Sequence, residues 1–442
     1  MQSSPQSATK NRAQLILQLK KNANSVNAHI KKHPATQPAP LSYSQERLWI
    51  MSQLEPNSPI YNMAGAIQLN GVLNTVALQQ SLNEVLRRHD ILRSRFVEEN
   101  NRTVQRVVHN KSLLFKQLDL SNAVEQQRLF DHCAQDFIRL PFNLSKGLPL
   151  RALLTTLNTQ QHILLISLHH IVADRWSVSL LMGEIAVLYA GFTQGTPSTL
   201  MELPIQYADF SLWQRQQNET VEKHRLYWQQ KLQHAPPLLE LPTDRPRPPI
   251  QSYHGNTVAF ELSQPLSATL TVLAKQKNVT LFMIMAAAFS VLLSRYSHHK
   301  DLTIGYPSAG RNQAQTANLI GFFVNTLVLR CHLQDDMPFS QYLKHLRDQA
   351  LQDQAHAELT FGQIVEAINP VRHAEHAPLF QVMLAVQNVP TTALQLADLT
   401  VTPLTLANEV SQFDLTLFVE HVDGKLQGFC LMLLPSKIWQ NT

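Results

Sequence analysis

Two adjacent histidines followed four residues later by an aspartate form the most chemically suggestive cluster in this sequence. His169 and His170 end an apolar run over residues 162–168, and Asp174 precedes a second apolar stretch. Histidine titrates near neutral pH, so it can take or hold a proton, for example that of an amine, which is largely protonated at that pH. The alternative is structural: the histidines end a strand, and Asp174 caps a helix in competition with Ser177.

The run over residues 162–168 is short and almost continuously apolar, which is typical of a strand buried on both faces. Successive strand residues point to opposite faces, so His169 and His170 cannot both enter one cavity unless the strand breaks there. We therefore expect one histidine to be chemical and the other structural. The same geometry disfavours a metal site at this pair, no HExxH or CxxC spacing supports one, and no metal is expected.

Helix and strand signals alternate along the chain, which predicts an α/β fold. Amphipathic helices are predicted over residues 75–89 and 177–190. The second half predicts helices over 266–277 and 280–296, with strands over 257–262, 302–306, 326–332, 380–386, 413–420 and 425–434.

The length of 442 residues exceeds what one hydrophobic core serves, so two lobes are expected. Prolines crowd residues 234–251 and forbid regular structure there. The predicted organisation is a leader helix and linker (1–40), an N-terminal lobe (41–235), a Pro-rich interlobe linker (236–251) and a C-terminal lobe (252–442).

The composition describes an ordinary globular chain, with 44% apolar and 16% charged residues. A net charge of +5 does not imply nucleic acid, although a modest basic surface would suit an acidic partner or a phosphate-bearing cofactor arm. The longest apolar run, over residues 281–293, is too short to span a bilayer, so no membrane partner is expected. Three dispersed cysteines and a polar N-terminus without a signal peptide predict a cytoplasmic protein.

Six dispersed segments resemble the core motifs of condensation domains in nonribosomal peptide synthetases. Residues 168–177, LHHIVADRWS, are similar to the HHxxxDG motif. The other matches follow the family's order and lie at 41–49, 88–96, 207–213, 320–326 and 378–383. Together they cover residues 41–387, and six matches are far more specific than one.

The resemblance implies two chloramphenicol-acetyltransferase-like lobes in a V-shaped pseudo-dimer, with a tunnel that admits two phosphopantetheine arms. It implies that His170 is the catalytic residue, as a base or as a group that positions the amine, and that Asp174 is structural and held by an arginine, for which we select Arg311. Three further residues are predicted to support the site: His169, Trp176 and Ser177. The residues predicted to line the substrate tunnel are Asn325, Ser308, Tyr207, Asp209 and Arg175.

The function implied is an acyltransferase that joins a carrier-bound donor aminoacyl or peptidyl thioester to a carrier-bound acceptor in nonribosomal peptide synthesis. No intrinsic cofactor is expected. The partners implied are donor and acceptor carrier proteins and an adjacent adenylation domain or another part of the synthetase. The wording of the first motif resembles domains that take an L-configured donor. The alternatives are a non-catalytic carrier-docking module, an epimerisation-type relative and an acyltransferase that uses coenzyme A.

Three departures from the family pattern bear on these expectations. Arg175 replaces the motif's glycine, and would either narrow the tunnel or project outward. Residues 373–377, HAEHA, differ from the usual sequence before the last Pro-Leu, in a predicted surface stretch. The sequence after Leu434 is unlike the family's continuation, which suggests that the last strand or helix of the C-terminal lobe is missing.

Overall fold

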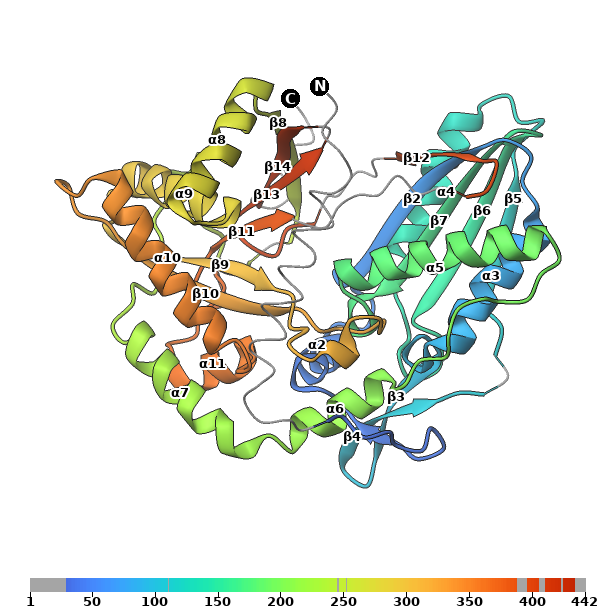
Figure 1. Cartoon of the computed structure of the whole chain (residues 1–442), viewed down its shortest axis with the longest axis horizontal. Helices are drawn as coiled ribbons and strands as arrows, with labels where there is room; N and C mark the ends of the chain where they lie inside the picture. Colours follow the sequence, from blue (N-terminus) through green and yellow to red (C-terminus); the bar gives the residue numbers. More distant parts are fainter. Residues whose placement is uncertain are drawn as a thin grey trace. The chain divides into compact units, whose positions relative to one another are not determined.

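The computed structural model describes residues 29–109, 111–244, 246–251, 253–387, 396–404, 410–422 and 424–433 (Figure 1). The chain divides into two compact units that are each discontinuous in sequence. Unit 1 contains Met1–Gln217, Ala309–Phe323 and Ala393–Thr405, and unit 2 contains Asn218–Ser308, Val324–Thr392 and Leu406–Thr442. Each unit combines helices with a β-sheet, which confirms the predicted α/β class.

The main sheet of unit 1 has five strands in the order β12-β2-β7-β6-β5. The central strand β7 (Gln161–His169) is antiparallel to both of its neighbours and is buried from its second residue to its last. This confirms the strand predicted over residues 162–168. The others are β2 (Asn62–Asn70), β5 (Leu114–Asp119), β6 (Leu150–Asn158) and β12 (Thr400–Leu404).

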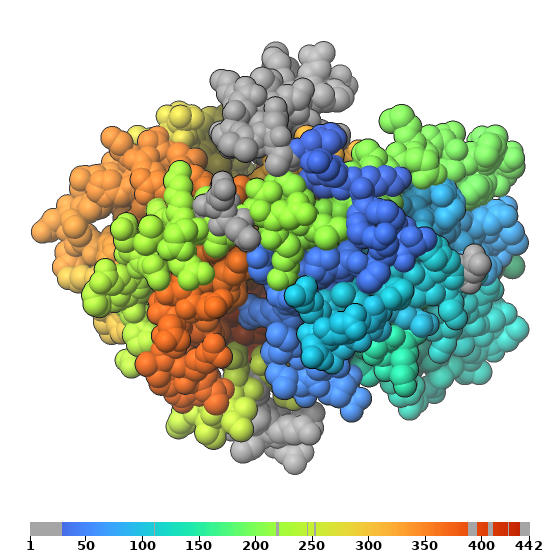
Figure 2. All heavy atoms as spheres, turned by 90° about the horizontal axis from the view of Figure 1, so that it is seen from below, coloured from blue at the N-terminus to red at the C-terminus, as the bar shows by residue number. Residues whose placement is uncertain are grey.

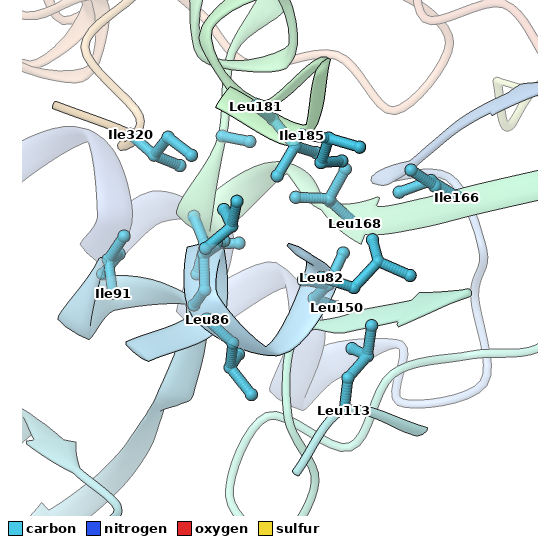
Figure 3. Close-up of a cluster of buried hydrophobic side chains, with 14 of the residues drawn as sticks. Leu82, Leu86, Ile91, Leu113, Leu150, Ile166, Leu168, Leu181, Ile185 and Ile320 are labelled. Carbon is cyan, nitrogen blue, oxygen red and sulfur yellow. The ribbon is translucent and has the colours of Figure 1, made fainter. Parts of the chain in front are cut away.

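Helices α3 (Thr75–Arg88) and α5 (Arg175–Thr193) pack against each other on this sheet, and α4 (Gln126–Arg139) contacts β2, β6 and β7. Figure 3 shows the apolar cluster that joins α3 and α5 to the sheet, which includes Leu82, Leu86, Leu150, Ile166, Leu168, Leu181 and Ile185. By length and composition α5 could cross a membrane, and its Leu181, Ile185, Leu188 and Tyr189 belong to this core. Both helices confirm the predicted amphipathic segments.

A smaller three-stranded sheet, in the order β1-β4-β3, completes unit 1. Its strands and the remaining short elements are β1 (Ala39–Pro40), α2 (Tyr43–Leu54), η1 (Asp90–Arg93), β3 (Ser94–Glu99), β4 (Arg102–Val107), η2 (His170–Val172), α6 (Tyr207–Arg215) and η3 (Ala314–Thr316). The predicted leader helix falls mostly on residues 1–28, outside the described chain. Residues 29–33, at the end of the predicted helix, have no regular structure, although Ile30 is buried and its N–H donates to Gln315 Oε1 at 3.0 Å. The predicted linker is exposed over residues 34–38, and its buried Ala39 begins β1.

The sheet of unit 2 has six strands in the order β10-β9-β11-β13-β14-β8. All six were predicted, with shifts of at most two residues at their ends. Their bounds are β8 (Gly255–Glu261), β9 (Asp301–Ser308), β10 (Asn325–His332), β11 (Val382–Gln387), β13 (Leu415–Val422) and β14 (Lys425–Leu433).

Unit 2 carries α7 (Asn218–Leu232), α8 (Gln264–Lys277), α9 (Leu281–Ser297), α10 (Phe339–Ala355) and α11 (Phe361–Ile368). Helices α8 and α9 confirm their predictions, and α9 is the predicted core helix, because Ile284, Ala287 and Leu293 on it are buried. Helices α7, α10 and α11 were not predicted. Figure 2 shows α7, in yellow-green, beside the orange residues of this helical layer, and α7 packs on α11.

The division into units differs from the predicted lobes in two ways. The chain enters unit 2 at Asn218, before the Pro-rich run at 236–251, because Trp228, Leu232 and Leu239 belong to the core of unit 2. The described part of that run lacks helix and strand, as predicted, but it belongs to unit 2. In addition, residues 309–323 and 396–404 lie in unit 1, although both were predicted to belong to the C-terminal lobe.

Candidate active site

The two histidines lie at a break in the central strand of unit 1. Strand β7 ends at His169, and the one-turn helix η2 begins at His170. Because the strand breaks between them, both side chains could have entered one cavity. The two rings nevertheless have different surroundings. His169 lies near the rings of Tyr61 and Phe142, whereas His170 lies against Phe322.

His169 is buried and fixes the backbone of the turn. Its Nδ1 accepts the N–H of Ile171 at 3.1 Å, so a neutral ring carries its proton on Nε2. The rings of Tyr61 and Phe142 lie about 6 Å from it, at 6.2 and 6.1 Å between centroids. Burial lowers the pKa of His169 to about 3, and the neighbouring His170 adds to the effect. This imidazole is therefore neutral at ordinary pH, and its contacts are those of a structural residue.

His170 is only partly exposed, and its Nδ1 is buried. A polar contact between this ring and a substrate must therefore be made by Nε2. The backbone N–H of His170 donates to Tyr61 O at 2.8 Å, and Phe322 packs edge-on against the ring at 4.8 Å between centroids. Burial lowers the pKa of His170, and the charge of Asp174 opposes this in part. A neutral imidazole held in a fixed position can accept a proton near neutral pH.

Asp174 is the N-cap of α5 and is almost completely buried. Its Oδ1 accepts the N–H of Ser177 at 2.8 Å and the hydroxyl of Ser177 at 2.7 Å, and its Oδ2 accepts the N–H of Phe323 at 3.1 Å. The capping alternative from the sequence is thus present, with Asp174 rather than Ser177 as the cap. The carboxylate also ties residues 309–323 to the start of α5, so it does more than cap a helix.

The predicted contact between Asp174 and Arg311 is present in the structure. Arg311 Nη2 lies 3.2 Å from Asp174 Oδ1, and both side chains are buried. The same guanidinium donates to the carbonyls of Thr316 and Leu319 at 2.6 and 2.8 Å, and it lies 4.1 Å from the centroid of the Phe323 ring. Burial lowers the pKa of Arg311, and Asp174 opposes that shift. Arg311 therefore organises the 309–323 segment as well as balancing the carboxylate.

The supporting residues Ser177 and Trp176 also contact this segment. The Ser177 hydroxyl accepts the Gly321 N–H at 3.1 Å and an Arg311 N–H at 2.9 Å. Trp176 Nε1 donates to Ala317 O at 3.1 Å. Both side chains therefore serve the attachment of residues 309–323 to the start of α5.

Gln45 holds the histidine turn from outside, a role that the sequence did not indicate. Its side chain is fully buried; Nε2 donates to Ile171 O at 3.0 Å, and Oε1 accepts the Ser42 N–H at 3.0 Å. Gln45 lies within the first motif match, and Phe322 lies within the fifth. The signal was therefore available as motif positions, but the contact that explains each position requires the fold.

Tyr207 and Asp209, predicted for the substrate tunnel, have structural contacts instead. The Tyr207 hydroxyl donates to Phe322 O at 2.7 Å and lies 2.9 Å from the Ser42 hydroxyl, and burial raises its pKa. Each Asp209 oxygen accepts a backbone N–H, from His33 at 2.6 Å and from Gln206 at 2.7 Å. The sequence interpretation is corrected for these two residues, because their polar atoms are already engaged within unit 1.

Ser308 and Asn325, also predicted for the tunnel, belong to unit 2 and bond within it. The Asn325 amide donates to the carbonyls of Ala357 and Leu359 at 2.9 and 2.8 Å, and its oxygen accepts the Phe361 N–H at 3.0 Å. The Ser308 hydroxyl accepts from Gln354 Nε2 at 3.0 Å. The prediction that Asn325 offers its amide to a cavity is therefore wrong: the amide joins β10 to the start of α11.

Arg175 replaces the motif's glycine without distorting the backbone. It is the first residue of α5, it is exposed, and it does not adopt a positive φ. The position therefore does not require glycine for its conformation. Of the two outcomes expected from sequence, an outward projection agrees with this exposure.

A family model for condensation domains matches residues 35–429, so the chain belongs to that family, as the resemblance implied. Its relatives are parts of nonribosomal peptide synthetases. It is 37% identical over 420 residues to one of the linear gramicidin synthase proteins of Brevibacillus parabrevis, a match that covers 93% of this chain and 8% of the relative. It is also 39% identical over 391 residues to malpinin synthetase of Mortierella alpina, covering 88% of this chain and 5% of the relative. The chain thus spans under one tenth of the length of either relative.

Solved structures of related domains share the fold. The X-domain from teicoplanin biosynthesis superposes with a TM-score of 0.82 at 22% identity, covering 92% of each chain, and has also been solved in a complex with OxyB. The first condensation domain of the CDA synthetase gives a TM-score of 0.78 at 16% identity, covering 91% of this chain and 93% of that one. At these identities the likeness concerns the fold alone.

Proposed function

We propose that this condensation domain forms an amide bond between two substrates held as thioesters on phosphopantetheine arms of carrier proteins. The observation that carries the proposal is the protonation and the fixed position of the His170 ring. The ring is neutral, packs against Phe322 and can present only Nε2, while the backbone N–H of His170 is held by Tyr61 O. The two charged residues of the cluster, Asp174 and Arg311, bind each other and the backbone and so hold this geometry.

In the proposed reaction, the acceptor amine attacks the carbonyl carbon of the donor thioester. A C–N bond forms and the C–S bond breaks, and the donor arm leaves as a thiolate. The amine proton passes to His170 Nε2 and then to the thiolate, so the protein ends unchanged. Asp174, Arg311 and Gln45 position the turn and take no part in proton transfer.

The test loads a donor and an acceptor carrier protein, adds the purified chain and follows the dipeptidyl carrier by intact mass. Product is expected from the parent chain, and a loss of about 100-fold or more from His170→Ala. His132→Ala is a matched control, because His132 is an exposed histidine on α4, paired with Asp136. Equal yields from the parent and His170→Ala would refute the role assigned to this ring.

Donor stereochemistry is tested with the same assay. We propose an L-configured donor, on the wording of the first motif, and expect faster turnover of an L-donor than of its D-isomer. A D-configured product that appears without condensation would identify an epimerisation-type enzyme instead. Release of free thiol from acyl-coenzyme A, with no carrier present, would indicate an acyltransferase that uses coenzyme A.

A non-catalytic docking module is the second candidate, and Arg175 favours it. This exposed residue stands directly after Asp174, where the motif has glycine, so the chain departs from the catalytic motif at that position. The X-domain from teicoplanin biosynthesis forms a complex with another protein, OxyB, so a domain of this fold can serve in assembly. Carrier binding without turnover by a well-folded chain would select this function.

For the cell compartment we propose the cytoplasm. The structure describes Cys133, Cys331 and Cys430, and all three are free thiols. Burial raises the pKa of Cys331 to about 12, so this thiol resists oxidation through its thiolate. Labelling of intact protein from cells with a thiol reagent after denaturation should find three reduced cysteines.

A further inference from the structure

A cluster of two histidines and a glutamate lies in the loop between α11 and β11 in unit 2, and neither the family function nor the proposed chemistry uses it. His373, Glu375 and His376 each offer a ligand atom, and these atoms all lie within 4.8 Å of one another. The stretch, residues 373–377, is one of the three departures from the family pattern in the sequence. We propose that His373, Glu375 and His376 bind a first-row divalent transition metal ion, Zn²⁺ above all.

The ring of His376 has the arrangement of a metal ligand. His376 is buried, and its Nδ1 lies 3.1 Å from the carbonyl of Ala377. Donation of the Nδ1 proton to this carbonyl leaves Nε2 with its lone pair available. Metal-binding histidines characteristically donate their second nitrogen to a carbonyl or carboxylate in this way, which fixes both the tautomer and the ring orientation.

His373 and Glu375 complete the set from the surface. His373 Nδ1 and Glu375 Oε1 are 3.9 Å apart, and their side chains are 40% and 41% exposed. The rings of His373 and His376 lie 4.7 Å apart between centroids. Ligands of a tetrahedral zinc ion at about 2.0–2.2 Å are roughly 3.3–3.6 Å apart. The two exposed side chains therefore need a movement of only about 1 Å to close around an ion.

The backbone of the loop is held in place before any ion binds. The Gln251 N–H donates to Ala374 O at 3.0 Å, Gln381 Nε2 donates to Ala377 O at 2.9 Å, and the Thr303 hydroxyl donates to Leu379 O at 2.6 Å. A fixed backbone lowers the entropy lost when the three side chains are ordered.

The ligand set selects the class of ion. Two imidazoles and one carboxylate suit zinc and its transition-metal neighbours, whereas Ca²⁺ and Mg²⁺ prefer oxygen ligands alone. Arg247 lies close to the cluster, with its Nη1 3.5 Å from Glu375 O, but its guanidinium forms an ion pair with Asp414. Three protein ligands leave at least one coordination position for water.

The test uses the whole chain, freed of any affinity tag and treated with a chelator. ZnCl₂ is titrated by calorimetry, and CoCl₂ is added in parallel to record the absorption bands of a tetrahedral Co²⁺ site. We expect one saturable site, no competition from excess MgCl₂ or CaCl₂, and affinity at least about 10-fold weaker in His373→Ala and His376→Ala. Glu375→Gln should weaken binding as well, because it removes the negative charge from the ligand set.

His132→Ala is the matched control, because His132 and Asp136 form an exposed two-ligand pair, 3.6 Å apart, without a third ligand in the described chain. It should bind Zn²⁺ as the parent chain does. Equal affinity in all variants, or no saturable binding, would overturn the proposal. If His376→Ala fails to fold by circular dichroism, the two surface variants decide the question alone. Amide formation is not a readout here, so failure of either proposal leaves the other testable.

Discussion

Replacement of Arg311 by methionine tests whether the buried ion pair holds residues 309–323 against α5. The change removes the counter-charge of Asp174 and the donors to the carbonyls of Thr316 and Leu319. Breaking a buried pair on one side costs about 3–5 kcal/mol, because the remaining charge is uncompensated. Asp174 would keep the N–H groups of Ser177 and Phe323, so we expect the lower end of this range, about 3 kcal/mol.

Asp174→Asn is the complementary change, because asparagine is also a good N-cap and preserves the start of α5 while removing the charge. It leaves the Arg311 cation buried with only carbonyl and hydroxyl partners, and it should cost about the same. In the double variant neither charge remains. Its cost should be smaller than the sum of the two single costs by about 1–3 kcal/mol.

Native-state hydrogen exchange of α5 peptides measures these costs as opening free energies within unit 1. Arg106→Met is the control, because Arg106 forms an exposed ion pair with Glu99 in the same unit and should leave α5 exchange unchanged. Strictly additive single costs, or singles that exchange like the parent chain, would show that the pair does not hold this segment in place.

Three further predictions concern protonation and backbone conformation. Because burial lowers the pKa of His170, the neutral base persists below its ordinary pKa of about 6.5; kcat should fall with acid only below that pH, and a limb centred above it would contradict the assignment. His169 has a pKa of about 3 when folded, so the unfolded chain binds an extra proton between about pH 6.5 and 3. The free energy of unfolding should fall by up to about 1.4 kcal/mol per pH unit on acidification through this window. Urea titrations of His169→Phe should show a shallower decline, and an equal decline in the variant would show that this ring is not buried in solution. Gly310 has a φ of +65°, and an added Cβ would lie 1.8 Å from Phe323 O. Gly310→Ala should therefore destabilise unit 1 by about 2 kcal/mol or more, whereas Gly183→Ala should not, because there is open space around Gly183 in α5. Equal melting midpoints for the two variants would refute the clash.

Local patterns were enough to predict the strand that ends at His169 and the helix that follows Asp174. An apolar run with two buried faces and a helical stripe after Asp174 are properties of neighbouring residues, so periodicity detects them. The strands of unit 2 were found for the same reason. Helices α7, α10 and α11 were not, and neither were several elements of unit 1, among them β12, whose pairing with β2 joins residues more than 300 positions apart in the chain.

The roles of individual side chains depended on contacts that no local pattern contains. Asp174 and Arg311 could be paired from the family resemblance, but Gln45, Tyr207 and Asn325 acquired their functions from partners on distant segments. The boundary between the units was also non-local, because Trp228 joins a core on the far side of a Pro-rich run. Periodicity records which residues must be buried, whereas the identity of the partner that buries or bonds each one is fixed only when the chain has folded.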